Sequence, residues 1–320
     1  MRMRGLLFLL LACAGTLAGP ADASAAETWP SARPISWIVG FSPGGSVDVI
    51  TRAVAQNVSA SLKQSIVVEN KPGGAGSIAL SNAARSMPDG YTLTTMAGPI
   101  LYGDTVPAIG KELSAVATLA KGAIVLVGPN NGPRDIRQLM DAIRAQPDRF
   151  AYASSGIGTG QHIAGEMFNF ALKAKMVHVP YKGGSQAIAD LLGGQVQLAF
   201  LGVSTVLEQI RNGKIVAYAV STPQRVPQLP AVPTLKEAGL ENFDVTQWYI
   251  VAAPAGLPGD VQARLKHAIS QAVESPDIRD LLDRNGLVAA DANDADAAQL
   301  VRNSLETAHA VARAANLSFR

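Results

Sequence analysis

The sequence predicts an α/β protein built from two domains. Short runs rich in β-branched and apolar residues recur along the chain, and stretches with helical periodicity separate them. Alternation of buried strands with amphipathic helices is typical of parallel α/β sheets. The roughly 290 residues that follow an N-terminal leader exceed one hydrophobic core, so we expect two domains of about 100 to 150 residues each.

The expected strands recur along the chain, most of them with helical stretches between them. They are ISWIVGF (35–41), SIVVEN (65–70), YTLTTMA (91–97), AIVLVG (123–128), FAYAS (150–154), MVHVP (176–180), VQLAF (196–200), IVAYAV (215–220) and WYIVAA (248–253).

The helical stretches differ in how clearly they are marked. The first, 46–62, carries Val47, Ile50, Val54, Val58 and Leu62 at three-to-four spacing, which predicts a core-facing stripe. Residues 222–239 hold four prolines and should run as an irregular surface connection. After Pro258 the pattern is helical to the end of the chain, so helices should complete the fold.

The N-terminus has the features of a secretory signal peptide, which we assign to residues 1–26. Two arginines precede an apolar run, and small residues in Ala-x-Ala patterns end it, with cleavage at Ala23, Ala25 or Ala26. The alternative is a lipoprotein anchor at Cys13, the single cysteine of the chain. We expect an exported protein of the bacterial periplasm, without a disulfide after cleavage.

Charge and motif content exclude several classes of function. The net charge is +2, and lysine and arginine do not cluster, so nothing favours nucleic acid or a membrane surface as a partner. Gly74, Gly76 and Ala79 match G-x-G-x-x-A, but no acidic residue stands between Asp89 and Asp104 to hold a ribose. Motifs for phosphate loops, serine hydrolases and zinc sites are absent from the sequence, so we expect no cofactor, no metal and no catalysis.

Glycine and hydroxyl residues gather in loops that join a predicted strand to the next helix. In open α/β sheets this edge binds ligands, and the free N–H groups of helix N-termini favour anions. Each loop alone is also typical of an ordinary turn or helix cap. Together they predict a carboxylate site in a cleft between domains. The loops are 41–48, 71–77, 96–99, 154–162, 181–185 and 201–204.

Several motifs in these loops together resemble the Bug receptors, the extracytoplasmic solute-binding proteins of tripartite tricarboxylate transporters. They occur in the family's order and cover nearly the whole chain after the leader. The motifs are FSPGGSVD, VVENKPGGAGSIA, MPDGYTL, SSGIGTGQHIAGEMF, HVPYKGGSQAIADLLGGQVQLAF, GKIVAYAVST, LPAVPTLKEAG and WYIVAAPAGLP.

The resemblance implies a two-lobed periplasmic binding protein of the type II, Venus flytrap kind, with two α/β domains joined by crossing strands. We expect one discontinuous lobe from 27–120 and 250–320, a second lobe from 121–249, and hinge strands near 116–128 and 245–253.

The resemblance also implies the ligand-binding residues, position by position. From the first lobe we expect Phe41, Ser42, Pro43, Gly44, Gly45, Asp48, Gly73, Gly74, Gly76, Ser77 and Ala97. From the second lobe we expect Ser154, Ser155, Gly156, Gly158, Thr159, His162, Tyr181, Gly183, Asp190 and Gly202. Asp48 has an alternative role in complementing a helix dipole, and Asp190 in tying down a loop.

The function implied is that of a monomeric receptor that binds a small carboxylate and delivers it to membrane permease subunits. Two alternatives stay open from the sequence: a receptor-like sensory component that signals to a membrane partner, and an exported α/β enzyme. The identity of the acid does not follow from these residues.

Overall fold

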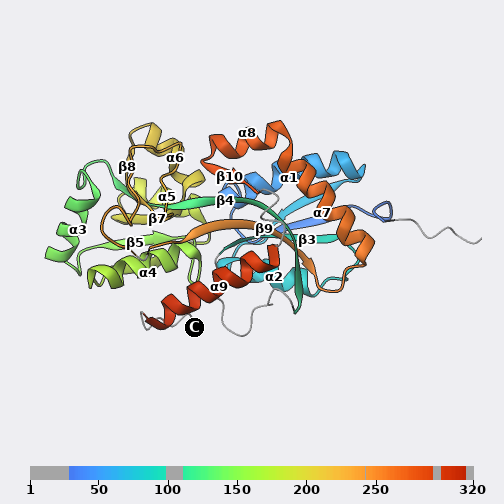
Figure 1. The fold of residues 1–320 in the computed structure, drawn as a ribbon, viewed down its shortest axis with the longest axis horizontal. Coiled ribbons are helices and arrows are strands. Elements are labelled where there is room, and N and C mark those ends of the chain that lie inside the picture. The colour runs from blue at the N-terminus through green and yellow to red at the C-terminus, as the bar shows by residue number, and fades with distance from the viewer. Residues whose placement is uncertain (1–28, 99–110, 242, 291–296, 315–320) are drawn as a thin grey trace, which may run out of the picture.

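The computed structural model describes residues 29–98, 111–241, 243–290 and 297–314 of the chain. The expected signal peptide and Cys13 lie outside these residues. The described chain forms an elongated molecule of two α/β halves, with helices on both faces of each half (Figure 1). This confirms the predicted two-lobed α/β class.

The first half begins with three strands that pair in parallel around β1. Strand β1 lies between β2 and β3, and its fully buried Trp37 donates to the Thr95 hydroxyl of β3 at 2.8 Å. The elements are β1 (Ile35–Val39), α1 (Ser46–Leu62), β2 (Ile66–Asn70), η1 (Gly74–Gly76), α2 (Ser77–Ala84) and β3 (Thr92–Gly98).

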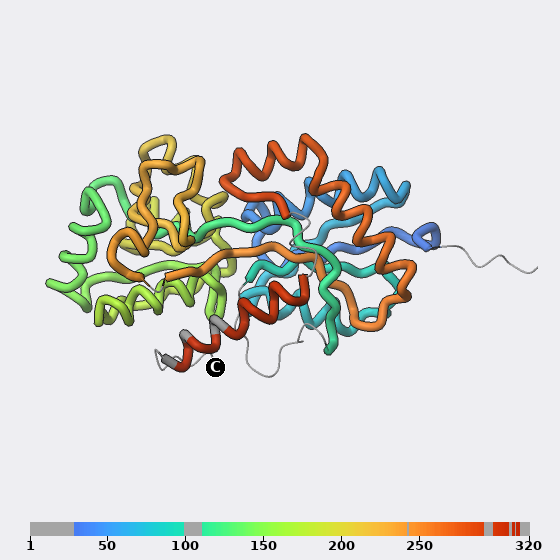
Figure 2. The backbone as a smooth tube through the Cα atoms, viewed as in Figure 1, coloured from blue at the N-terminus to red at the C-terminus, as the bar shows by residue number. Residues whose placement is uncertain are grey.

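Two long strands carry the chain between the halves. Strand β4 (Leu113–Pro129) pairs antiparallel with β9 (Thr246–Pro254) through Ala123, and with β7 from Ile124 onward. Strand β9 continues the first half's sheet through its antiparallel pairing with β3. The path of the chain through β4 and back through β9 can be followed in Figure 2.

The second half is built from the middle of the chain. Strand β5 lies between β6 and β7 in parallel, and β7 and β8 both pair antiparallel with β4. The elements are α3 (Ile136–Ala145), β5 (Ala151–Ser154), α4 (Gly160–Leu172), β6 (Val177–Pro180), α5 (Gly184–Leu192), β7 (Leu198–Gly202), α6 (Val203–Arg211) and β8 (Ile215–Val220).

C-terminal elements return to the first half. Helices α7 (Gly259–Glu274) and α8 (Pro276–Arg284) pack beside α1, and β10 (Leu287–Ala289) pairs with β4. Helix α9 (Ala297–Ala314) runs along β9 toward α4 of the other half (Figure 1). Its Ser304 hydroxyl accepts from the Trp248 indole at 2.8 Å, which ties this helix to the crossing strand.

Three expectations need correction. The sheets are mixed rather than parallel, because β4 and β9 cross between the halves and run antiparallel to their neighbours. Strand β4 begins at Leu113, ten residues before the predicted run, and the short strand β10 was not predicted. The first helix spans 46–62 as predicted, and Val47, Ile50, Val54 and Val58 are buried along it, whereas Leu62 at its end is only partly buried.

Candidate functional site

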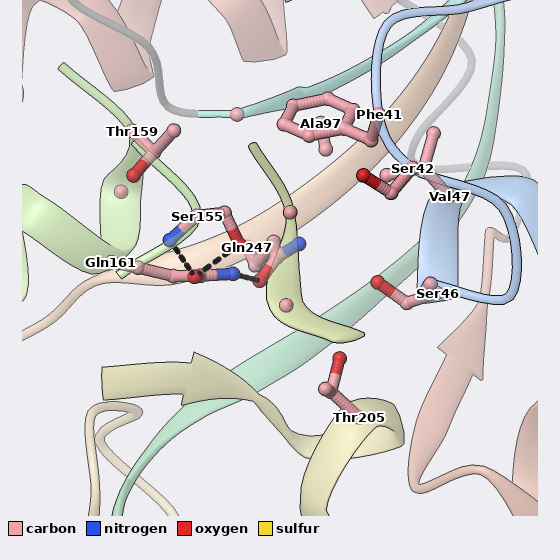
Figure 3. Close-up of a pocket in the computed structure, with 15 residues that line it drawn as sticks. Phe41, Ser42, Ser46, Val47, Ala97, Ser155, Thr159, Gln161, Thr205 and Gln247 are labelled. Atoms are coloured by element: carbon pink, nitrogen blue, oxygen red, sulfur yellow. Dashed lines mark hydrogen bonds between the residues drawn. The ribbon is translucent and has the colours of Figure 1, made fainter. Parts of the chain in front are cut away.

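A cavity lies where four helices begin, between the two halves. Gly45 precedes α1, Thr159 precedes α4 and Gly183 precedes α5, and all three line the cavity. Thr205, in the first turn of α6, lines it as well. The empty space there is about 440 Å³, a figure that includes solvent at the open side of the cavity. Figure 3 shows side chains from these segments facing one another across it.

The cavity is polar but carries no charged side chain among the described residues that line it. Helix N-termini present unpaired N–H groups and the positive end of the helix dipole. In α1, α5 and α6 no side-chain bond caps these N–H groups, whereas in α4 the Thr159 hydroxyl accepts from His162 N–H. The arrangement therefore suits an anion that takes up main-chain donors.

Seven of the predicted site residues line this cavity. They are Phe41, Ser42, Gly45, Ala97, Ser155, Thr159 and Gly183. The other predicted residues are not among the cavity's lining residues, and several of them have contacts that explain their place. They are Pro43, Gly44, Asp48, Gly73, Gly74, Gly76, Ser77, Ser154, Gly156, Gly158, His162, Tyr181, Asp190 and Gly202.

Asp48 fixes the loop that leads into α1. Its carboxylate accepts from Gly44 N–H at 3.0 Å, from Arg52 at 2.9 Å and from the Asn70 amide at 2.9 Å. The side chain is almost fully buried. Arg52 therefore bonds to both Asp48 and Asn70, and the Asp48–Arg52 ion pair helps to hold the loop that precedes α1.

The second glycine loop lies behind the cavity and at its rim. At Gly76, φ is +96°, and its Cα lies 2.6 Å from where a Cβ on Gly40 would stand. Ala75 lies against Gly156 of the other half, since a Cβ on Gly156 would come within 3.3 Å of the Ala75 Cβ. This loop joins the two halves at the cavity's edge and keeps the strand end and the turn tightly packed.

A second contact joins the halves beside the first loop. Ser42 N–H donates to the Lys182 carbonyl at 3.4 Å, and the Ser42 hydroxyl donates to the same oxygen at 3.3 Å. A Cβ on Gly183 would stand 3.3 Å from Ser42 N. Nearby, the Tyr181 hydroxyl donates to Asp190 at 2.7 Å, so Asp190, on α5, holds the loop that precedes this helix.

Behind the 154–159 loop, aromatic rings form a stack. His162 lies over His178 with ring centroids 3.9 Å apart, and His178 lies over Tyr152 at 4.9 Å. Burial lowers the pKa of His162 to about 4. Burial, with a smaller contribution from His162, lowers the pKa of His178 to about 3. Both rings are neutral near pH 7.

The neutral histidines hold the loop through specific bonds. His162 Nδ1 accepts from Gly158 N–H at 3.1 Å, and His178 Nε2 lies 2.7 Å from the Ser154 hydroxyl. Tyr152 donates to Glu166, and burial together with this carboxylate raises the Tyr152 pKa well above its ordinary range. His162 and Ser154 therefore do not line the cavity themselves but hold the loop that carries the lining residues Ser155 and Thr159.

The residue-by-residue prediction omitted part of the lining. Six of the omitted residues lie within the predicted loops 41–48, 96–99, 154–162 and 181–185: Ser46, Val47, Gly98, Gly160, Gln161 and Gly184. Thr205 follows the loop ending at 204, and Gln247 lies on the crossing strand. All eight line the cavity. Only the predicted return of a strand near 246 could have suggested Gln247, because no glycine or turn signal marks it.

None of the helices in the described part of the chain has the length and apolar character to cross a membrane. Within the same residues, no three His, Cys, Asp or Glu side chains are grouped as a metal site would require.

Comparison with known proteins shows that the chain is similar to receptors. Residues 50–317 match the family model described as the tripartite tricarboxylate transporter family receptor. Protein BugT of Bordetella pertussis is 34% identical over 282 residues, covering 86% of this chain and 85% of BugT. MatC from Rhodopseudomonas palustris, solved with bound malate, has a TM-score of 0.83 at 26% identity, covering 89% of this chain and 99% of MatC. A second R. palustris protein, solved with adipate, has a TM-score of 0.85 at 26% identity, covering 91% and 99%.

Proposed function

Because the chain belongs to the tripartite tricarboxylate transporter receptor family, which includes the Bug proteins, we propose that it is an extracytoplasmic receptor for a small carboxylate. The cavity between the halves is the binding site, and the bound acid is delivered to membrane subunits of a tripartite transporter. The observation that carries the proposal is the meeting of four helix N-termini around a cavity whose described lining residues carry no charged side chain.

The main-chain donors can supply the affinity such a receptor needs. A hydrogen bond to a charged group contributes roughly 1.5 to 3 kcal/mol. Three or four of them supply the roughly 8 kcal/mol of micromolar binding. Phe41 and Val47 add apolar walls, which suits the carbon chain of a small organic acid. The acids in the two R. palustris structures support the same ligand class.

The lobe bounds and the binding residues are part of the proposal. We propose lobes of 27–120 with 250–320, and of 121–249. The change of pairing partner in β4 after Ala123 supports a crossing close to this bound. Within the site, the seven predicted residues that line the cavity are proposed to contact the acid, and the other predicted residues to shape it.

Export and the absence of catalysis also remain proposals. We propose that the leader directs the protein to the periplasm, where it acts as a monomer that releases its ligand unchanged. Closure of the two lobes around the acid would then present one state of the receptor to the membrane partner.

A thermal-shift screen tests the proposed function. The mature chain is heated with small mono- and dicarboxylates, including malate and adipate, and with sugars, polyamines and nucleotides. A ligand at 100 times its dissociation constant stabilises a protein by about 2.7 kcal/mol, so at least one acid should raise the melting temperature clearly. Recovery of that acid unchanged by mass spectrometry separates a receptor from an enzyme. A shift with a sugar, and none with any acid, would overturn the ligand class.

A further inference from the structure

Two buried glutamines form the inner wall of the cavity. Gln161, at the start of α4, and Gln247, on the crossing strand β9, both line the cavity and are 6% and 5% exposed. The Gln161 amide nitrogen donates to the Gln247 oxygen at 3.4 Å, which joins the second half to the crossing strand. Figure 3 shows the two side chains end to end between Ser155 and the strand.

A backbone amide fixes the direction of this chain of hydrogen bonds. Ser155 N–H and the Ser155 hydroxyl both bond to Gln161 Oε1, at 2.9 and 2.6 Å. A backbone N–H can only donate, so the oxygen of Gln161 must face Ser155 and its nitrogen must face Gln247. The Gln247 oxygen then faces Gln161, and its nitrogen donates to the Tyr249 hydroxyl at 3.0 Å.

The direction of these hydrogen bonds decides which amide atoms can still bond to a ligand. Gln161 Oε1 already takes two bonds, and the Gln247 oxygen takes the bond from Gln161 and lies beside Gly202, since a Cβ on Gly202 would stand 2.8 Å from it. Each amide nitrogen has a second hydrogen beyond the one used in the chain. The wall is therefore organised to offer N–H donors, and its acceptors are turned toward the protein.

We propose that Gln161 and Gln247 are specificity-determining residues that donate N–H bonds to an oxygen of the ligand. The inference rests on the proposed function and deepens it, since it states which chemical group of the ligand the inner wall recognises. The wall selects a group that only accepts, a carboxylate or carbonyl oxygen, and rejects a group that must donate there, such as a carboxamide NH₂ or an ammonium.

The test compares substitutions at Gln247 with a neighbour on the same strand. Gln247→Leu removes the donor without adding charge. Gln247→Glu keeps the shape but replaces the donor by an acceptor. Thr246→Val is the control, because successive side chains on a strand face opposite sides and Thr246 bonds to Asp244 outside the cavity. Calorimetric titration of each folded protein with malate, succinate and adipate, and with their monoamides, gives the affinities.

For the acid that binds the wild type most tightly, we expect Gln247→Leu to weaken binding about tenfold or more, and Gln247→Glu to weaken it further. Gln247→Glu should also shift the affinity ratio toward the monoamide, because the amide can donate to the new carboxylate. A purely structural role for Gln247 would leave that ratio unchanged, and Thr246→Val should leave both affinities unchanged.

The inference is overturned if the wild type binds an acid and both Gln247 variants bind it equally well with the same ratio. If a Gln247 variant fails to fold, the same titrations are made with Gln161→Leu and Gln161→Glu, to which the same two outcomes apply. If the wild type binds none of the acids, the proposed function fails first, and this inference falls with it.

Discussion

At the scale of single residues, the stacked histidines make the folded state sensitive to acid. The pKa values of His162 and His178 lie near 4 and 3 in the folded protein, below the 6.5 of an unfolded histidine. The unfolded chain therefore binds more protons below pH 6.5. The stability that the neutral rings contribute is present in full above this pH and is lost as the pH falls toward the folded values.

We expect the free energy of unfolding to fall by about 1.4 kcal/mol for each pH unit and each of these histidines between pH 6 and 4. Denaturant melts at pH 7, 6, 5 and 4 measure this slope. His178→Phe keeps a ring in the stack without a titrating group, so its slope should be shallower. An equal slope in His178→Phe and wild type would contradict this explanation.

At the scale of elements, two helix caps allow an effect on stability to be distinguished from an effect on ligand binding. Asp135 caps α3 by accepting from Gln138 N–H at 2.9 Å, far from the cavity lining. Thr159 caps α4 by accepting from His162 N–H, and it lines the cavity. The same type of bond is thus made once at the site and once away from it.

We expect Asp135→Ala to lower stability by about 1 kcal/mol without changing affinity for an acid. Thr159→Ala should lower stability by a similar amount and also weaken binding, because the start of α4 would no longer be held against the ligand. Denaturant melts and calorimetric titrations of the two variants measure both quantities. Equal affinities in Thr159→Ala and wild type would show that the start of α4 does not contact the acid.

The elements also differ in whether local sequence patterns were enough to predict them. Helix α1 was predictable because a regular apolar stripe and a glycine-rich start define it. The residue pattern did not indicate the first part of β4, and only the resemblance implied a strand from about 116. LSAVATLAK mixes small and polar residues whose burial comes from pairing with β9, more than 120 residues later. Strand β10 has three residues, too few to show a period, and depends on the same strand β4.

At the scale of the whole molecule, the site is assembled from segments far apart in the sequence. Glycine loops marked the rim and part of the wall, and Phe41, Ser155 and Gly183 do line the cavity. Gln247 and Thr205 could not be predicted, since they reach the cavity only through the crossing of β9 and the approach of α6. Local patterns thus indicated the edge of the site, and the tertiary arrangement completes its inner wall.

The two halves touch directly at the cavity's edge, through Ser42 with the Lys182 carbonyl and through Ala75 with Gly156. A hinge motion around a ligand would change these contacts. The two hydrogen bonds from Ser42 are long, 3.3 to 3.4 Å, so each of them is weak.

The central claim, that uncharged donors in this cavity bind a small carboxylate, is tested most directly by calorimetric titration of the mature chain. The acid that stabilises the protein most in the thermal screen is compared with its own full amide. We expect one acid per protein molecule with a micromolar dissociation constant. The amide, which lacks the charge, should bind about 100-fold more weakly, since each charge-assisted bond becomes a neutral one. Equal binding of acid and amide, or no binding of any acid, would contradict the account.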